Sequence, residues 1–458
     1  MLPALPPGPR LLIADRPISS AAEDRLERGG LVDAITRTVE RAPREGFVVG
    51  LAGPWGEGKS SVLNLVAEKI DTRGTAQVIH FNPWLFAETD ELLERFFGEF
   101  AAQIKLRGGG ERLARALSRY GRAAAPLTAI PKVGLVAAVS RRLALGGATL
   151  LRSGTSLHER REQLKRALTE MERPILVVVD DVDRLRSNRE ISEMVRLIRL
   201  VGDLPRVTYL VAYEPNAIAR ALGDEDEERG QAYLEKVVQA VFELPPIRRD
   251  LLERLLGDAI EQAVGEVDAL RFSRERLTTL QVAGLFALFR NLRDIRRFAG
   301  ALPAVVAGVG DEVELFDVLA LEALRLLEPR VFQLIAEAVD VLTGHQGDLI
   351  QAVRQQRDDS REGVQAILDR ADRSEIVRDL IRELFPSAGR HLGGGSYSPT
   401  FQGVWRRERR VAHHDVLVTY LERGLRADEL PATAVEDALA VLDDREKLRR
   451  VLAGLSEP

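Results

Sequence analysis

The spacing of apolar positions divides the chain into two parts. Through the first part, short apolar runs rich in β-branched residues alternate with stretches of helical spacing. We expect strands at residues 46–51, 76–81, 174–179, 207–213 and 241–245. Because helical stretches separate these strands, the crossovers should be right-handed and the sheet parallel. The pattern therefore predicts an α/β domain with helices on both faces of its sheet.

After Pro246 the pattern changes to helical spacing, and strong strand signals end. We expect helices at residues 251–264, 277–289, 318–327 and 436–452. The stretch 386–403 is rich in Gly, Ser and Pro, which favours a loop. A helical domain is therefore expected to follow the α/β domain.

Composition narrows the class of protein. The 458 residues carry a formal net charge of −5 and are 45% apolar, so global disorder is excluded and a large core can form. The absence of cysteine excludes disulfides, thiolate metal sites and cysteine nucleophiles. The first residues lack the regions of a signal peptide, and no window holds about 18 uncharged apolar residues. We therefore expect a soluble, cytoplasmic protein of several domains.

The strongest chemical signal is a glycine-rich turn after the first predicted strand. Gly53-Pro-Trp-Gly-Glu-Gly-Lys-Ser60 matches the pattern G-x-x-x-x-G-K-[ST], and a helical pattern follows it. Such a loop binds a polyphosphate through backbone N–H groups and the dipole of the helix N-terminus. Lys59 would reach the β- and γ-phosphates as a catalytic residue, and the Ser60 hydroxyl would ligate Mg²⁺. The candidate nucleotide-binding residues are Gly53, Pro54, Trp55, Gly56, Glu57, Gly58, Lys59, Ser60 and Ser61.

A second metal-binding group follows the third predicted strand. Asp180-Asp-Val-Asp183 comes directly after the apolar run, at the carboxyl end where open α/β sheets bind ligands. Asp180 would hold Mg²⁺ through water, and Asp181 would orient or deprotonate the attacking water as a catalytic residue. The alternative is that these acids cap the next helix, a role that suits Asp183 in particular. How Asp180 and Asp181 divide the work stays open.

The strand predicted at 207–213 follows the acidic motif in the chain. In P-loop ATPases of the additional-strand class, such a strand inserts between the strand of the phosphate loop and that of the acidic motif. Its end carries a polar sensor of the γ-phosphate, for which Glu214 and Asn216 are the candidates. A polar strand end can equally be a solvated surface.

Together these residues resemble the KAP family of P-loop NTPases. The tryptophan in the phosphate loop is typical of that family. The resemblance covers about residues 15 to 335 and weakens beyond. The stretches that carry it, in family order, are 15–18, 23–26, 53–56, 81–86, 180–185, 233–239, 242–245, 291–298 and 321–329.

The resemblance implies an α/β P-loop NTPase core of the additional-strand class, followed by an α-helical domain that folds over the nucleotide. It implies ATP hydrolysis, and it identifies Lys59, Ser60 and Asp180 as functional residues. It also makes Arg293 a candidate catalytic arginine, with a solvated helix face as the alternative. Bacterial members often serve in phage exclusion or defence. Further candidates are Arg296 at the phosphate, Arg184, Arg196 and Arg199 across a subunit boundary, and Asp24 and Arg25 near the adenine.

A basic segment, residues 112–158, separates the two halves of the predicted core. It has no Asp or Glu, and it contains Lys132, the pair Arg141-Arg142 and five further arginines. These charges interrupt apolar pieces that could otherwise span a bilayer. Many members of the family have transmembrane helices at this place. Three kinds of partner stay open: another subunit or partner protein, an anionic membrane surface, and nucleic acid.

The expected organisation has four segments. They are 1–104, the first part of the P-loop core; 105–166, a basic, partly apolar insertion; 167–246, the second part of the core; and 247–458, the helical region. We expect a Mg²⁺-dependent ATPase whose hydrolysis drives a conformational switch, in a homo-oligomer or with a partner protein. The alternatives are a nucleotide-gated scaffold with slow turnover and a nucleic-acid-stimulated motor. Lipid binding by the basic segment would place the protein at the inner face of the membrane.

Overall fold

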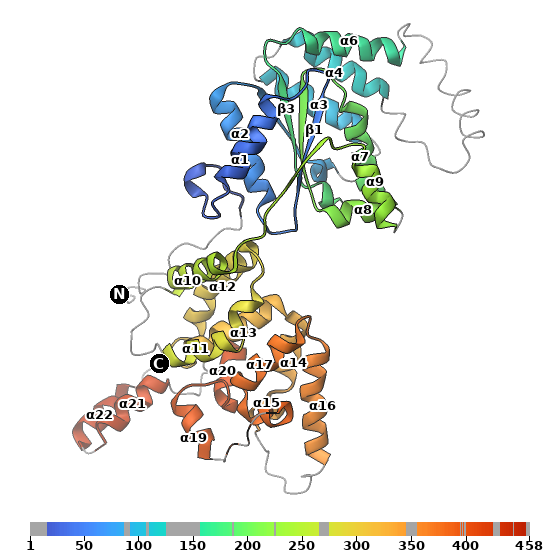
Figure 1. The fold of residues 1–458 in the computed structure, drawn as a ribbon. Helices are drawn as coiled ribbons and strands as arrows, with labels where there is room; N and C mark the ends of the chain where they lie inside the picture. The colour runs from blue at the N-terminus through green and yellow to red at the C-terminus, as the bar shows by residue number, and fades with distance from the viewer. Residues whose placement is uncertain are drawn as a thin grey trace. The chain divides into compact units, whose positions relative to one another are not determined.

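The computed structural model describes residues 16–86, 92–106, 110–124, 156–185, 187–223, 226–264, 274–344, 355–393, 395, 397, 400–424, 431–442 and 444–454. They form two compact units, shown in Figure 1. The α/β unit is Arg16–Ile247, and the helical unit extends from Arg248 onward.

The α/β unit is built on a parallel sheet whose strand order confirms the predicted topology. Its strands in the described part of the chain are β1 (Phe47–Ala52), β2 (Gln77–Phe81), β3 (Ile175–Val179), β4 (Val207–Tyr213) and β5 (Ala240–Glu243). Their order across the sheet is β2-β3-β4-β1-β5, and β4 pairs in parallel with both β1 and β3. The strand after the acidic motif thus inserts between the strands of that motif and of the phosphate loop, which is the additional-strand arrangement.

Alternate residues of the strands point to opposite faces of the sheet, and each face has its own core. In β3, Ile175, Val177 and Val179 pack on one face, and Leu176 and Val178 pack on the other. The face of Leu176 is covered by α1 (Gly29–Glu40) and α2 (Lys59–Arg73), as Figure 1 shows. Burial on both faces explains why these strands are continuous apolar runs in the sequence. The face of Ile175 is covered by α3 (Leu92–Leu106), α4 (Glu111–Ala124), α6 (Leu157–Thr169), α7 (Asn188–Val201), α8 (Pro215–Gly223) and α9 (Glu227–Leu234).

The helices at the two ends of the basic segment pack on the α/β unit itself. α4 buries Leu113, Leu117 and Tyr120 and contacts both α3 and α6. The fit is close, because a Cβ added to Gly121 would lie 2.6 Å from the Cβ of Phe97. Residues 125–155 lie outside the described residues. The opposite face of α4 carries the exposed side chains of Arg112, Arg115, Arg119 and Arg122.

The helical unit has no strand among its described residues, as the sequence predicts. In α13 (Leu315–Leu327), two fully buried carboxylates are paired with arginines: Asp317 with Arg276, and Glu322 with Arg325 and Arg423. Among the described residues of both units, no helix has the length and hydropathy that crossing a lipid bilayer requires. The helices of this unit are α10 (Arg249–Val264), α11 (Arg274–Val282), α12 (Leu292–Val309), α13 (Leu315–Leu327), α14 (Pro329–Glu337), α15 (Val339–Thr343), α16 (Gln355–Asp369), α17 (Ser374–Leu384), α18 (Pro386–Gly389), α19 (Thr400–Arg407), α20 (His414–Glu422), α21 (Ala432–Ala440) and α22 (Arg445–Gly454).

Three predictions for this unit differ from the structure. The helix expected at 277–289 is interrupted, because Gly284 has a φ of 99° and starts a separate 3-10 turn. The helix expected at 436–452 is two helices, α21 and α22, and the Asp444 carboxylate accepts backbone hydrogen bonds at the start of the second. The stretch 386–403 was expected to be a loop, but it contains α18 and the start of α19, since proline suits the first turn of a helix.

Candidate functional site

The predicted phosphate loop joins the end of β1 to the start of α2. Because α2 begins at Lys59, loop residues 53–58 lead directly into the first helical turn. Gly56 and Gly58 have φ values of 85° and 93°, a left-handed conformation that is costly for residues with a side chain. The glycines therefore let the loop turn tightly before the helix N-terminus, whose N–H groups attract anions.

Lys59 is buried against the loop that precedes it. Its Nζ donates hydrogen bonds to the carbonyl oxygens of Gly53 (2.8 Å) and Pro54 (3.1 Å). Burial lowers the pKa of Lys59, and the charges of Asp183, Asp180 and Glu214 oppose that shift. The ammonium group is thus surrounded by oxygen atoms.

Ser60 and Asp180, the two expected metal ligands, lie together. The Ser60 side chain lies close enough to the Asp180 carboxylate to lower its pKa. Burial raises the pKa of Asp180, the nearby Ser60 side chain opposes that shift, and the charge of Asp181 adds to it. Hydroxyl and carboxylate oxygens fit Mg²⁺, which takes its other ligands from water and phosphates. In the described part of the chain no group of three His, Asp or Glu side chains could hold a metal.

Asp181 lies beside Asp180 in a left-handed conformation with a φ of 59°. Its carboxylate accepts a hydrogen bond from Asn82 Nδ2 (3.3 Å) and pairs with Arg184 Nε (2.8 Å). Its backbone N–H donates to Asp180 Oδ1 (2.9 Å). These contacts join the loop after β2 to the loop after β3, and they fix the orientation of the Asp181 carboxylate.

Asp183 is a functional candidate that the sequence did not reveal. The alternative role suggested for Asp183, capping the next helix, is filled by Ser187, whose side chain accepts the capping hydrogen bond of α7. The Asp183 side chain, only 3% exposed, lies beside the phosphate loop instead. Asp183 Oδ2 accepts a hydrogen bond from Trp55 Nε1 (2.5 Å) and lies 3.6 Å from Lys59 Nζ. The spacing of the acidic run could not indicate this, since the contact depends on a 3-10 turn formed by the run itself.

The two sensor candidates at the end of β4 differ in position. Glu214 lies near enough to Lys59 for its charge to raise the pKa of that lysine. Its carboxylate also accepts hydrogen bonds from the N–H groups of Asn216 (3.2 Å) and Ala217 (2.5 Å) at the start of α8. Glu214 thus lies close to Lys59, while Asn216 is exposed on the first turn of α8.

The segment that contains Asp24 and Arg25 lies against α2. The Ile18 N–H donates to Ser61 Oγ (3.3 Å), which ties the segment to the first turn of that helix. The Asp24 carboxylate accepts a hydrogen bond from the Arg28 N–H (2.7 Å). Asp24 therefore forms a turn in a segment that borders the phosphate-loop helix.

Arg293, the candidate catalytic arginine, belongs to the helical unit. The Asn291 side chain caps α12 by accepting the Asp294 N–H (2.9 Å), so Arg293 lies in the first turn of that helix. Arg199, a candidate for action across a subunit boundary, lies 5.5 Å from the centre of the Tyr233 ring. Arg199 is thus in contact with an aromatic side chain of its own unit. A role of Arg293 at a nucleotide is a proposal.

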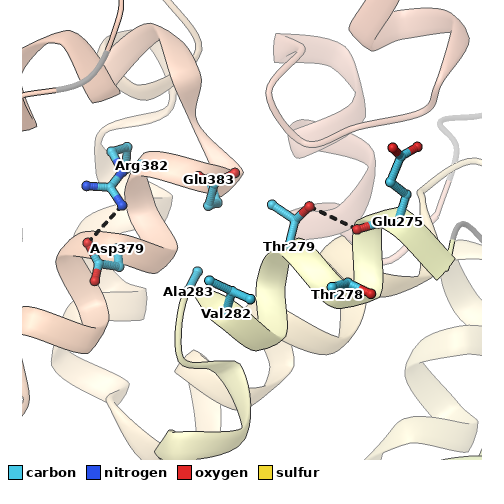
Figure 2. A pocket seen from close by; sticks show the side chains of 8 residues that line it. All are labelled: Glu275, Thr278, Thr279, Val282, Ala283, Asp379, Arg382 and Glu383. Atoms are coloured by element: carbon cyan, nitrogen blue, oxygen red, sulfur yellow. Dashed lines mark hydrogen bonds and ion pairs between the residues drawn. The ribbon is translucent and has the colours of Figure 1, made fainter.

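The helical unit also has an open recess of about 680 Å³, lined by residues of α11 and α17. Figure 2 shows that Arg382 pairs with Asp379 (3.1 Å) and that the Thr279 hydroxyl donates to the Glu275 carbonyl (2.9 Å). With Glu383 also present, three acidic side chains and one basic side chain line the recess. A polyphosphate would be repelled there, so the phosphate loop remains the candidate nucleotide site.

The geometry of the α/β unit agrees with the family comparison. Residues 31–309, more than half of the chain, match the model of the KAP family P-loop domain. This chain belongs to the KAP family. The match runs from α1 to the end of α12, so it includes Lys59, Asp180 and Arg293. The resemblance seen in the sequence is confirmed, and membership of this P-loop NTPase family implies nucleotide binding.

Similarity to individual proteins is more distant. The phage T7 exclusion protein of Escherichia coli (strain K12) is 26% identical over 354 residues, which cover 69% of the KAP-family chain and 46% of that protein. The chain thus spans about half the length of this curated relative. Among solved structures, Cdc6p from Pyrobaculum aerophilum is 14% identical with a TM-score of 0.33, covering 88% of this chain and 96% of that one. AMPPCP-bound DnaA from Aquifex aeolicus is 12% identical with a TM-score of 0.30, covering 87% and 94%. At these TM-scores neither structure carries an argument about this chain.

Proposed function

We propose that this KAP-family chain is a Mg²⁺-dependent ATPase whose hydrolysis drives a conformational switch. The observation that carries the proposal is the convergence of Lys59, Ser60 and Asp180 where the glycine-rich loop meets α2. A buried cation, a hydroxyl and a carboxylate in this arrangement suit a metal-bound polyphosphate. The match to a family of P-loop NTPases supports the same conclusion.

The groups around the phosphate loop would divide the work of binding. Lys59 would exchange its hydrogen bonds with loop carbonyls for bonds to the β- and γ-phosphates. Ser60 and Asp180 would hold Mg²⁺, which neutralises phosphate charge when it is bound. The loop glycines leave room for backbone N–H groups to approach the phosphate oxygens.

Hydrolysis also requires a positioned water and added positive charge. Asp181 would orient the attacking water, because Asn82 and Arg184 hold its carboxylate beside Asp180. Arg293, which the family resemblance makes a candidate, would supply positive charge at the γ-phosphate. Glu214 is the candidate sensor, because it lies close to Lys59.

We further propose that the switch serves in phage exclusion or defence. The support is kinship with a KAP-family protein named for exclusion of phage T7, of which this chain spans about half. The basic segment 112–158 is the proposed contact with a partner, which would be a partner protein or second copy, an anionic membrane surface or nucleic acid.

Lys59→Ala tests the nucleotide site. We expect the parent protein to bind and hydrolyse MgATP. The variant should lose at least about tenfold in affinity and fall to background turnover, because alanine cannot neutralise phosphate charge. Calorimetry measures the binding, and release of inorganic phosphate measures the turnover.

The matched control is Lys69→Ala. Lys69 lies on the same helix but pairs with Asp33, away from the loop. This variant should bind and hydrolyse MgATP as the parent does. The proposal fails if the parent neither binds nor hydrolyses ATP, or if Lys59→Ala leaves turnover unchanged.

A further inference from the structure

One carboxylate oxygen of Asp183 faces two donor groups: it accepts a hydrogen bond from Trp55 and forms an ion pair with Lys59. Asp183 Oδ2 accepts the Trp55 indole N–H at 2.5 Å and lies 3.6 Å from the ammonium nitrogen of Lys59. The two charged side chains are only 3% and 9% exposed, so water screens them weakly. The indole is the nearer partner, while hydrogen bonds to loop carbonyls hold Lys59.

The two donors compete for the same acceptor. A hydrogen bond to a carboxylate stabilises its charge, and here the indole takes the closer position at Oδ2. Without the indole N–H, Lys59 would be the nearest positive group to a buried and under-bonded carboxylate. A shorter Lys59–Asp183 pair would then be favoured, because buried charges attract strongly and must be satisfied. A lysine held in such a pair is less available to phosphate oxygens.

We propose that Trp55 is a positioning residue that holds the Asp183 carboxylate and thereby keeps Lys59 available to a polyphosphate. The inference rests on the proposed function, because it concerns the same phosphate loop. Trp55 as a residue is 58% exposed, so its side chain adds little to the core of the α/β unit. Its contribution is the indole hydrogen bond, which ties the phosphate loop to the loop that carries the acidic motif.

Two substitutions should shift nucleotide affinity in opposite directions. Trp55→Phe keeps an exposed ring but removes the N–H, so Asp183 closes on Lys59. We expect the affinity for MgADP and for inorganic pyrophosphate to fall about three- to tenfold. Asp183→Asn keeps an acceptor for the indole but removes the competing negative charge, and we expect affinity to rise about threefold.

The double variant separates positioning from loss of structure. Once Asp183→Asn is present, Trp55→Phe should have little further effect, because no charged carboxylate remains to hold Lys59. Calorimetric affinities are complemented by steady-state kinetics, in which the single variants should change KM while kcat stays within about twofold. Trp84→Phe is the matched control, since Trp84 is similarly exposed (51%) but lies outside the phosphate loop.

The outcomes distinguish this inference from the proposed function. If the parent binds neither MgADP nor pyrophosphate, the proposed function fails and the inference fails with it. If the parent binds both, but Trp55→Phe leaves affinity unchanged or both substitutions weaken binding equally, the inference alone is overturned. Because the Trp55 side chain is exposed, Trp55→Phe decides the case even where Asp183→Asn lowers the stability of the protein.

Discussion

Asp181 combines a left-handed backbone with a carboxylate held by two side chains. Its φ of 59° is a conformation that Asp and Asn tolerate better than other residues with a side chain. A substitution that removes charge without straining the backbone is therefore available. The sequence pointed to Asp181 because it follows Asp180, but it could not predict Asn82 as a partner, since β2 and β3 meet only in the folded sheet.

Asp181→Asn should separate hydrolysis from binding. We expect kcat to fall by about a hundredfold or more, because an amide cannot accept a proton from water, and the Kd for MgATP to change less than about threefold. Single-turnover hydrolysis and equilibrium binding measure the two effects. If the parent turns over negligibly and the substitution changes nothing, a nucleotide-gated scaffold replaces the ATPase.

At the scale of elements, strands were predicted more closely than helix ends. The strand expected at 207–213 coincides with β4, because burial on both faces leaves an apolar run that ends where the strand ends. The apolar spacing at 277–289 continues through Gly284, whose positive φ breaks the helix without interrupting the pattern. At the candidate site, the glycine-rich motif at residues 53–60 predicts the phosphate loop and the place of Lys59 at its end. The position of Asp183 depends on a 3-10 turn that no periodicity shows.

Glu314, at the N-terminus of α13, gives the helical unit a pH-dependent stability. Its Oε2 accepts the Asp317 N–H (2.8 Å), while Oε1 is buried with no hydrogen-bond partner among the described residues. Burial, together with the charge of Asp317, raises the pKa of Glu314 from 4.5 to about 7. The fold therefore favours the protonated acid. The stability from this group is fully present below pH 4.5 and is lost as pH rises through about 7.

Glu314→Gln should flatten this pH dependence, because the amide is neutral and still accepts the Asp317 N–H. Above pH 7 the variant should be more stable than the parent by on the order of 1–2 kcal/mol, with little difference near pH 4.5. Urea unfolding at pH 5 and pH 8 measures the change. Glu337→Gln, an exposed position of α14, is the control and should leave the profile unchanged. A Glu314→Gln protein less stable than the parent at pH 8 would contradict the account.

At the scale of the whole molecule, a net charge of −5 averages over an uneven distribution. Segment 112–158 contains eight Lys and Arg side chains and no acid, and four of these arginines lie on the exposed face of α4. The other face of α4 is packed into the core of the α/β unit. A partner that binds these arginines would therefore contact the unit that carries the phosphate loop.

A joint replacement of Arg119, Arg122, Arg141 and Arg142 by alanine tests the role of segment 112–158. ATPase activity is measured with the protein alone and then with DNA, RNA or anionic vesicles. A polyanion that binds these arginines should stimulate turnover, and its effect should decline from about 50 to 200 mM salt as counterions compete. The variant should lose that stimulation and keep its basal turnover. Stimulation that survives the substitution would show that the partner binds elsewhere. If no polyanion stimulates the parent, a change in the oligomeric state of the variant would assign the segment to contact between subunits.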